Sequence, residues 1–399
     1  MIATDVLVIG GGCVGVSVAK HLAESSNLDI SIAEKEYHLA QHQTGRNSGI
    51  IKPGFNFEPG SKRARYSIER TRRMKRYNEK HDLPVKEFGV MLVANDDEEE
   101  RRLHDLQEEA ERNGVETEIL DSPEAIHEYE PHASGQAALY CPEAASVDSQ
   151  LFLYTLADEV RDLGVDFHMG HEVRSVMSTG DSYLVKTTNG DFNAKYVVNA
   201  AGLYADKIAD SLGVDHDYQI VPFRGEYYEL VPEKAGLVNS MIYPTPDPEL
   251  PFLGVHYTRR VDDKVILGPN AVLAFGREAY SNTDFDLAEL SDTLSYPGFW
   301  KLIASRKMAK VAVDELKKSY SKEEFISDAQ RLVPEIEASD FRTSYSGIRS
   351  QLVSNDGSLI KQPTVVEQGN SSHILQTSWM TSSLPFGEKI AESVIESLD

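Results

Sequence analysis

The chain has 399 residues, of which 41% are hydrophobic and 26% charged, so it can form two or three domains and is neither a disordered chain nor a mini-protein. Its 40 Lys and Arg residues against 64 Asp and Glu residues give a net charge of −24. That charge disfavours nucleic-acid or anionic-membrane partners, and it resembles the acidic surface of halophilic proteins.

The cysteines and the N-terminal hydropathy favour a cytoplasmic protein. Cys13 and Cys141 are too few for a disulfide framework. The longest early uncharged run, residues 6–19, is shorter than the roughly 20 apolar residues of a membrane-spanning helix. No Lys or Arg precedes it, as one would in a secretory signal. We therefore expect a reducing compartment and no transmembrane segment.

The first 34 residues predict a βαβ unit. Residues 4–9 form an apolar, β-branched run that is typical of a buried parallel strand. Apolar residues recur at helical spacing over residues 14–22, and residues 29–34 predict a second strand. A dinucleotide-binding fold begins with this order of elements.

A glycine-rich turn joins the first strand to the helix. Gly10, Gly12 and Gly15 occupy the G-x-G-x-x-G positions, where they permit a tight turn, the approach of a pyrophosphate and close helix packing. Glu34 ends the second strand, where its carboxylate can accept a hydrogen bond from a ribose hydroxyl. The alternative is a purely structural turn, which we consider weaker. Glu34 disfavours NADP, so FAD and NAD remain.

Two unusual segments follow. Residues 41–54 are polar and rich in glycine, and a loop of that length in a compact domain is usually functional. Residues 62–80 are strongly basic, against the overall charge. They form either a patch for an acidic partner or, as we favour, a solvated helix that pairs with acidic neighbours.

The rest of the chain alternates between helices and strands. We expect strands at residues 88–94, 165–169, 172–177, 182–187, 192–199 and 373–376, several strands within 222–268, and helices at 96–113, 149–163, from 204, over 287–320 and from 388. The strand that ends at Asn199 runs into Ala200 and Gly202, small residues that let a backbone approach a cofactor closely.

The predicted fold class is α/β: a Rossmann-like FAD-binding domain with a parallel sheet, and a second α+β substrate domain built on an antiparallel sheet. We expect residues 1–84, 146–220 and 343–399 in the first domain. Residues 85–145 and 221–342 are expected in the second.

Nearly the whole chain resembles the FAD-dependent D-amino-acid-oxidase-like superfamily, and most closely its L-2-hydroxyglutarate dehydrogenase/oxidase branch. The motifs that carry this resemblance are 44–49 (TGRNSG), 59–61 (PGS), 224–228 (RGEYY), 243–248 (YPTPDP), 251–256 (PFLGVH), 268–274 (GPNAVLA), 297–300 (PGFW) and 347–351 (GIRSQ). Those within residues 224–277 are the most specific.

The resemblance implies a bound FAD whose site spans the cofactor domain. The implied contacts are Gly10, Gly12, Cys13, Val14, Gly15, Glu34, Lys35, Thr44, Gly45, Arg46, Asn47, Ser48, Val173, Ala200, Gly202, Arg349, Ser382, Ser383 and Leu384. A helix N-terminus after Ser382 would stabilise the negative charge of a reduced flavin.

The implied reaction is the oxidation of a small 2-hydroxy acid to the 2-oxo acid by hydride transfer to flavin N5. Such chemistry needs a base and a carboxylate clamp. His256 is the candidate base, because imidazole accepts a proton near neutral pH. Arg277 and Arg349 are the candidate clamps, because a guanidinium binds a carboxylate through two hydrogen bonds. The substrate would be a small anionic carboxylate.

Lys52 departs from the family pattern, which has a histidine there. A lysine near the flavin would stabilise the reduced anion, assist electron transfer to oxygen or bind a second carboxylate, or it would simply reach solvent. The loop at residues 379–387 is also bulkier than the family pattern.

Other functions stay open at this point. An amine or amino-acid oxidase of the same superfamily is one, and a non-catalytic flavin-binding redox partner is another. An NAD-linked dehydrogenase is weaker, because no second glycine-rich βαβ unit stands out. The electron acceptor, whether oxygen, a quinone or an electron-transfer protein, is not indicated.

Overall fold

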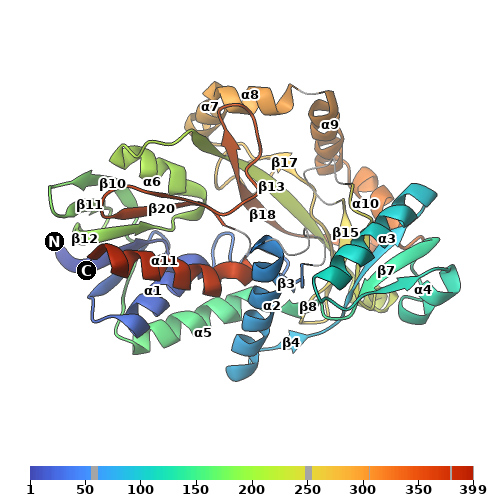
Figure 1. Ribbon diagram of the computed structural model, residues 1–399. Helices are drawn as coiled ribbons and strands as arrows, with labels where there is room; N and C mark the ends of the chain where they lie inside the picture. Colours follow the sequence, from blue (N-terminus) through green and yellow to red (C-terminus); the bar gives the residue numbers. More distant parts are fainter. Residues whose placement is uncertain (55–61, 248–253, 305, 378–379, 399) are drawn as a thin grey trace.

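The computed structural model describes residues 1–54, 62–247, 254–304, 306–377 and 380–398. Within them the chain forms two large sheets joined by a small three-stranded sheet. Figure 1 shows the first sheet and its helices at one end of the molecule, with both chain termini, and the second sheet at the other end. The motif at residues 59–61 and part of those at 243–248 and 251–256 lie outside the described residues.

The first sheet has the order β10-β11-β12-β1-β2-β9, with β20 paired to β12 and β19 paired to β20. Its strands are β1 (Ile2–Ile9), β2 (Ile30–Glu34), β9 (Asp166–Met169), β10 (Val173–Ser178), β11 (Tyr183–Thr187), β12 (Phe192–Asn199), β19 (Thr364–Glu367) and β20 (Ser371–Gln376). Strands β12, β1, β2 and β9 run parallel. The continuous burial of residues 6–9 explains why the second half of β1 is uniformly apolar.

Helices cover both faces of this sheet. On one face α1 (Cys13–Ser25) packs against α5 (Ser149–Asp162) and α11 (Ser383–Leu398), and α6 (Ala205–Leu212) lies on the other (Figure 1). The predicted α/β class is thereby confirmed. Helix α11 begins five residues before the predicted start at 388, because Pro385 falls in its first turn, where a missing N–H costs no intrahelical bond.

The second sheet has the order β17-β13-β16-β15-β14-β5-β7-β6, with β18 paired to β13. Its strands are β5 (Val90–Ala94), β6 (Glu118–Leu120), β7 (Ala137–Cys141), β13 (Tyr218–Leu230), β14 (Met241–Pro244), β15 (His256–Arg259), β16 (Val265–Gly268), β17 (Val272–Leu273) and β18 (Phe341–Ser354). Except for the parallel pair β14–β5, its pairings are antiparallel. The expected antiparallel sheet of the second domain is confirmed.

The predicted boundary at residue 343 falls inside β18. This strand pairs with β13 from Tyr218↔Ser354 to Leu230↔Phe341, so it belongs to the second sheet. The chain returns to the first sheet only at β19. Because β13 and β18 are far apart in the chain, no local sequence pattern indicates that they pair.

Further helices surround the second sheet. They are α3 (Asp97–Arg112), α4 (Pro123–Tyr129), α7 (Leu287–Ser295), α8 (Pro297–Ile303), α9 (Arg306–Tyr320) and α10 (Lys322–Gln330). The predicted single helix over 287–320 is therefore three helices, the second of which begins with Pro297 at its first position.

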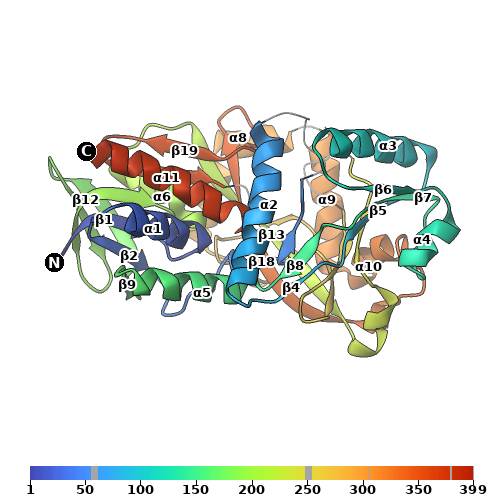
Figure 2. The same ribbon diagram turned by 60° about the horizontal axis from the view of Figure 1, so that its bottom comes forward.

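The basic helix α2 (Lys62–Lys80) crosses the middle of the molecule beside the small sheet of β3 (Ile50–Ile51), β4 (Val85–Lys86) and β8 (Ala145–Val147) (Figure 2). Arg73 pairs with Glu69 and Glu388, and Lys75 pairs with Glu87, as the favoured interpretation of a solvated, acid-paired helix expects. No helix among the described residues has the length and hydropathy needed to cross a bilayer.

Candidate functional site

A cavity of about 240 Å³ opens where β1 and β2 end. Its lining comes from the glycine turn, the end of β2, the loop after it, the start of β10 and the turn after β12. The predicted cofactor contacts among its lining residues are Gly10, Gly12, Glu34, Lys35, Thr44, Val173, Ala200 and Gly202. Residues far apart in the sequence therefore converge on one cavity, as the βαβ prediction requires.

The glycine turn has the geometry that a dinucleotide needs. Gly10 has φ +108°, and a Cβ on Gly15 would lie 2.1 Å from the Gly10 carbonyl oxygen, so neither position accepts a side chain. A Cβ on Gly12 would meet nothing closer than Thr44 Oγ1 at 3.5 Å. Gly12 therefore leaves its backbone open to a ligand.

The N-terminus of α1 is suited to an anion. Gly12 is its N-cap and supplies no side-chain hydrogen bond, and the first turn contains no acidic residue. The Cys13 amide donates to Thr44 Oγ1 at 3.2 Å. Burial raises the pKa of the Cys13 thiol, so this cysteine is a packing residue. Together with the cavity, this helix end fits the pyrophosphate of FAD.

Glu34 is buried at the end of β2, and backbone amides hold its carboxylate. Gly11 N donates to it at 2.7 Å and Glu36 N at 2.9 Å. The neighbouring Lys35 pairs with Glu278 and lies over the Tyr204 ring at 4.9 Å. These contacts fix the carboxylate at the cavity wall, where a ribose would meet it.

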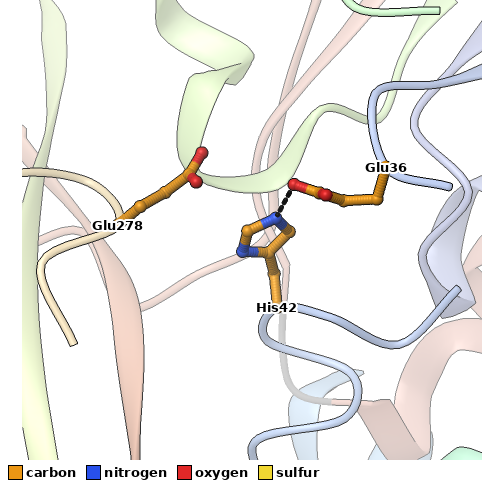
Figure 3. A group of neighbouring side chains, drawn as sticks. All are labelled: Glu36, His42 and Glu278. Carbon is orange, nitrogen blue, oxygen red and sulfur yellow. Dashed lines mark hydrogen bonds and ion pairs between the residues drawn. The ribbon is translucent and has the colours of Figure 1, made fainter. Parts of the chain in front are cut away.

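A group of His and Glu side chains lies beside the cavity. Figure 3 shows the His42 ring turned towards Glu36, and the two are joined by a hydrogen bond of 2.9 Å, with Glu278 nearby from another segment. The other ring nitrogen of His42 contacts the Tyr280 hydroxyl at 2.6 Å, and Glu278 accepts from Tyr204 at 2.8 Å. Lys35 also holds Glu278, so protein contacts satisfy this group without a metal ion.

The loop at residues 44–49 connects the cavity to the second sheet. Arg46 donates to the Ser346 carbonyl at 3.2 Å, and the Tyr345 hydroxyl donates to the Asn47 carbonyl at 2.9 Å. A Cβ on Gly347 would lie 2.3 Å from the Arg46 carbonyl oxygen, which shows how closely the loop and β18 approach. Gly45 lies within the same turn, and Ser48 acts to lower the pKa of Tyr227 on β13, although burial raises that pKa more strongly.

The start of α11 lies beside the first turn of α1. Ser383 is fully buried and interacts with the Cys13 thiol, which Val14 and Gly15 follow in the helix. The Leu384 carbonyl contacts the His21 ring at 3.1 Å. These contacts place the start of α11 against α1, and Ser382, Ser383 and Leu384 do not line the cavity itself.

Arg70 was missed by the sequence reasoning. It is 6% exposed, and it donates to Ser382 Oγ at 3.0 Å. The sequence held a signal for a buried face on this helix, because residues 70, 74 and 77 or 78 recur at helical spacing. In the structure these residues form the buried face of α2. The strongly basic composition of this helix concealed that face.

A second cluster of candidate residues lies on the second sheet. His256 begins β15, is 6% exposed, and stacks on Tyr243 of β14 with ring centroids 3.8 Å apart. The Lys52 ammonium lies 3.6 Å from the centroid of the same tyrosine ring. Arg349 is exposed on β18, and its charge acts on both His256 and Tyr227.

The electrostatics of this cluster keep His256 neutral. Burial, with the charges of Lys52 and Arg349, lowers the pKa of His256 to about 3. Its Nδ1 lies 2.8 Å from the Gly254 carbonyl oxygen, an acceptor, so Nδ1 carries the ring proton and Nε2 keeps its lone pair. Burial also lowers the pKa of Lys52 to about 7. The imidazole therefore keeps a free lone pair at Nε2, but the neighbouring cations make it a weak base as long as their charge is uncompensated.

Arg277 does not join this cluster. Its guanidinium donates to both carboxylate oxygens of Asp206, at 2.6 and 2.9 Å, and to the Leu203 carbonyl oxygen. The ion pair is buried, with Arg277 2% and Asp206 1% exposed. Because the Asp206 carboxylate already occupies the guanidinium fork, we propose that Arg277 is a structural residue and not the substrate clamp that the sequence suggested.

Comparisons with known proteins agree with this geometry. The model of the family described as FAD dependent oxidoreductase (DAO) matches residues 5–392. The chain is 36% identical over 392 residues to L-2-hydroxyglutarate dehydrogenase of Indibacter alkaliphilus, covering 97% of this chain and 98% of the relative. It is 34% identical over 394 residues to the Escherichia coli K12 protein of that name, covering 98% and 93%.

A solved structure has the same fold. L-α-glycerophosphate oxidase from Mycoplasma pneumoniae, solved with FAD bound, aligns with a TM-score of 0.75 at 21% identity and covers 100% of this chain and 95% of that one.

Proposed function

The chain belongs to the FAD dependent oxidoreductase family, and we propose that it oxidises a small 2-hydroxy acid of the L-2-hydroxyglutarate type to the corresponding 2-oxo acid. The observation that carries this proposal is the cluster on the second sheet, in which the neutral imidazole of buried His256 shares the Tyr243 ring with the Lys52 ammonium and is acted on by the charge of the exposed Arg349. An anionic hydroxy acid needs those groups: cations for its carboxylate and a lone pair for its hydroxyl proton. The named relatives share the activity.

When bound, FAD would supply the redox chemistry, because a flavin can take up the hydride that leaves the substrate carbon. The chain holds it through the glycine turn, the uncapped end of α1 and Glu34. The further contacts proposed along the cofactor are the loop with Gly45, Arg46, Asn47 and Ser48, and the segment with Ser382, Ser383 and Leu384.

His256 and Arg349 act on the substrate. Arg349 binds the carboxylate next to the hydroxyl through its planar fork. His256 accepts the hydroxyl proton at Nε2, while the Nδ1–H bond to Gly254 fixes the tautomer. The C–H bond loses its electron pair with the hydrogen as hydride, and the hydroxyl oxygen forms the new carbonyl.

The carboxylate binds against the overall field of the protein. A net charge of −24 repels an anion at long range, so Lys52 and Arg349 must reverse the sign locally. Salt at 1 M reduces the Debye length to about 3 Å, which screens the distant acids and leaves short contacts in place. We place the enzyme in the cytoplasm, where the buried, unbridged Cys13 and Cys141 would stay reduced.

An anaerobic substrate panel tests the function. The purified flavoprotein is mixed with L- and D-2-hydroxy acids and with amino acids, and flavin bleaching is followed. The proposal expects rapid bleaching by a 2-hydroxy acid. Bleaching by amino acids alone would favour the amino-acid oxidase alternative, and no bleaching by any compound would favour a non-catalytic flavoprotein.

A further inference from the structure

Lys52 is a cation without an acidic partner in the described part of the chain. Its ammonium contacts the face of the Tyr243 ring, and its backbone carbonyl accepts a hydrogen bond from Thr71 of α2. Other buried cations do have acidic partners: Lys20 pairs with Glu24 and Glu159, and Arg277 pairs with Asp206. In a chain with 64 acidic residues, a half-buried lysine beside an aromatic face lacks the anion that would normally stabilise it.

The surroundings of Lys52 point to a ligand anion. Tyr243 joins Lys52 to His256, because the ammonium and the imidazole both lie against its ring, at 3.6 and 3.8 Å from its centroid. Arg349 also acts on His256. Two cations therefore act on one proton acceptor, and a substrate with one carboxylate would neutralise only one of them.

We propose that Lys52 is a specificity residue that binds the second carboxylate of a dicarboxylic 2-hydroxy acid, while Arg349 binds the carboxylate next to the hydroxyl. This inference rests on the proposed function and deepens it. It predicts that the enzyme selects substrates with two carboxylates over substrates of equal length with one.

The ion pair between Lys52 and the second carboxylate of the substrate also affects the base, His256. Lys52 and Arg349 both lower the pKa of His256, so a dianion that neutralises them removes two causes of its weak basicity. A dicarboxylate thereby makes His256 a better proton acceptor at the moment it binds. A monocarboxylate leaves the charge of Lys52 uncompensated beside the imidazole.

Binding should also take up a proton. Burial lowers the pKa of Lys52 to about 7, and a bound carboxylate favours its charged form. Among the described residues, Tyr243 on β14 and His256 on β15 share its surroundings, Arg349 on β18 acts on His256 and on Tyr227 of β13, and Arg70 precedes the α2 residue that donates to the Lys52 carbonyl. Burial raises the pKa of Tyr243 and Tyr227 and lowers that of His256 to about 3, so among Tyr243, Tyr227, His256 and Lys52 it is Lys52, with a pKa of about 7, that titrates between pH 6 and 9.

The test compares two substrates that differ only at the far end. L-2-hydroxyglutarate has a carboxylate where L-2-hydroxyvalerate has a methyl group. The variants are Lys52→Met, Lys52→Arg and the control Lys80→Met, whose side chain is 71% exposed on α2. Anaerobic flavin reduction gives the rate and apparent affinity for each substrate.

We expect Lys52→Met to lower kcat/KM for L-2-hydroxyglutarate roughly 100-fold and to leave L-2-hydroxyvalerate within a few-fold of its wild-type value. Lys52→Arg should recover much of the preference, and Lys80→Met should behave as wild type. An equal loss with both substrates, or an unchanged preference, would overturn the inference. A wild-type enzyme that oxidises no 2-hydroxy acid would instead overturn the proposed function, and the inference with it.

A binding measurement needs no variant at the site. Glutarate, a dicarboxylate without the hydroxyl, is titrated into wild-type holoenzyme, and the flavin spectrum reports its dissociation constant. We expect this constant to rise about tenfold per pH unit above pH 7, whereas that of valerate stays flat. The same pH dependence for both compounds would contradict proton uptake at Lys52.

Discussion

Replacement of Arg277 by methionine tests whether this arginine holds the fold or the substrate. Asp206 would keep only two backbone donors, Lys207 N at 2.9 Å and Ile220 N at 3.0 Å, and would lose both bonds to the guanidinium. Removing one partner of a buried ion pair costs about 3–5 kcal/mol, because the other charge stays buried. With an unfolding entropy of about 2.1 cal/mol/K per residue, that loss lowers the melting temperature by roughly 4–6 °C if the chain melts as one unit.

Thermal unfolding, followed by circular dichroism, and anaerobic kinetics are measured on the same sample. The matched control is Arg112→Met, which breaks an exposed pair with Glu108 and should cost at most about 1 kcal/mol. We expect Arg277→Met to melt lower and to keep the wild-type KM below its melting range. An unchanged melting temperature with a large rise in KM would refute the structural role and restore Arg277 as a substrate clamp.

Three further changes test the cofactor cradle, the base and the buried lysine. Gly15→Ala puts a Cβ 2.1 Å from a carbonyl oxygen and should give misfolded, colourless protein. Gly12→Ala should fold and bind FAD more weakly. Equal FAD content in the two variants would contradict the roles assigned to these glycines in FAD binding. His256→Asn should lower kcat/KM at least 100-fold at unchanged FAD content, and an unchanged rate would exclude His256 as the base. Lys52→Met should raise the melting temperature of the apoprotein at pH 7. Between pH 7 and 10.5 Lys52 carries a proton in the unfolded wild type that it has lost in the folded state, so wild-type stability rises with pH. The difference in melting temperature between Lys52→Met and wild type should therefore shrink as the pH rises. A difference that stays constant would contradict the lowered pKa of Lys52.

The cofactor half of the site was predictable because its signals are local. Strand β1, the glycine turn, α1 and β2 follow one another within 34 residues, and each has the hydrophobic period or small residue that its conformation needs. For that reason the sequence could indicate Gly10 and Gly15 as positions of a tight turn and of close helix packing. The structure adds the distances that show why neither position accepts a side chain.

The features that the sequence did not show depend on partners distant in the chain. Arg277 looked like a clamp because nothing nearby in sequence shows Asp206, 71 residues earlier, as its partner. Strand β18 was divided at residue 343 because its partner β13 lies more than 100 residues away. The contact of Lys52 and His256 with one tyrosine ring likewise joins β14, β15 and the segment after β3, and no local pattern reports it.

The most direct test of the central claim is an anaerobic titration of the holoenzyme with L-2-hydroxyglutarate, in which flavin bleaching and 2-oxoglutarate are measured together. The proposed reaction predicts complete bleaching with one 2-oxoglutarate formed per FAD reduced. A flavin that stays oxidised with L-2-hydroxyglutarate and other 2-hydroxy acids, in protein that binds FAD and melts cooperatively, would contradict the claim.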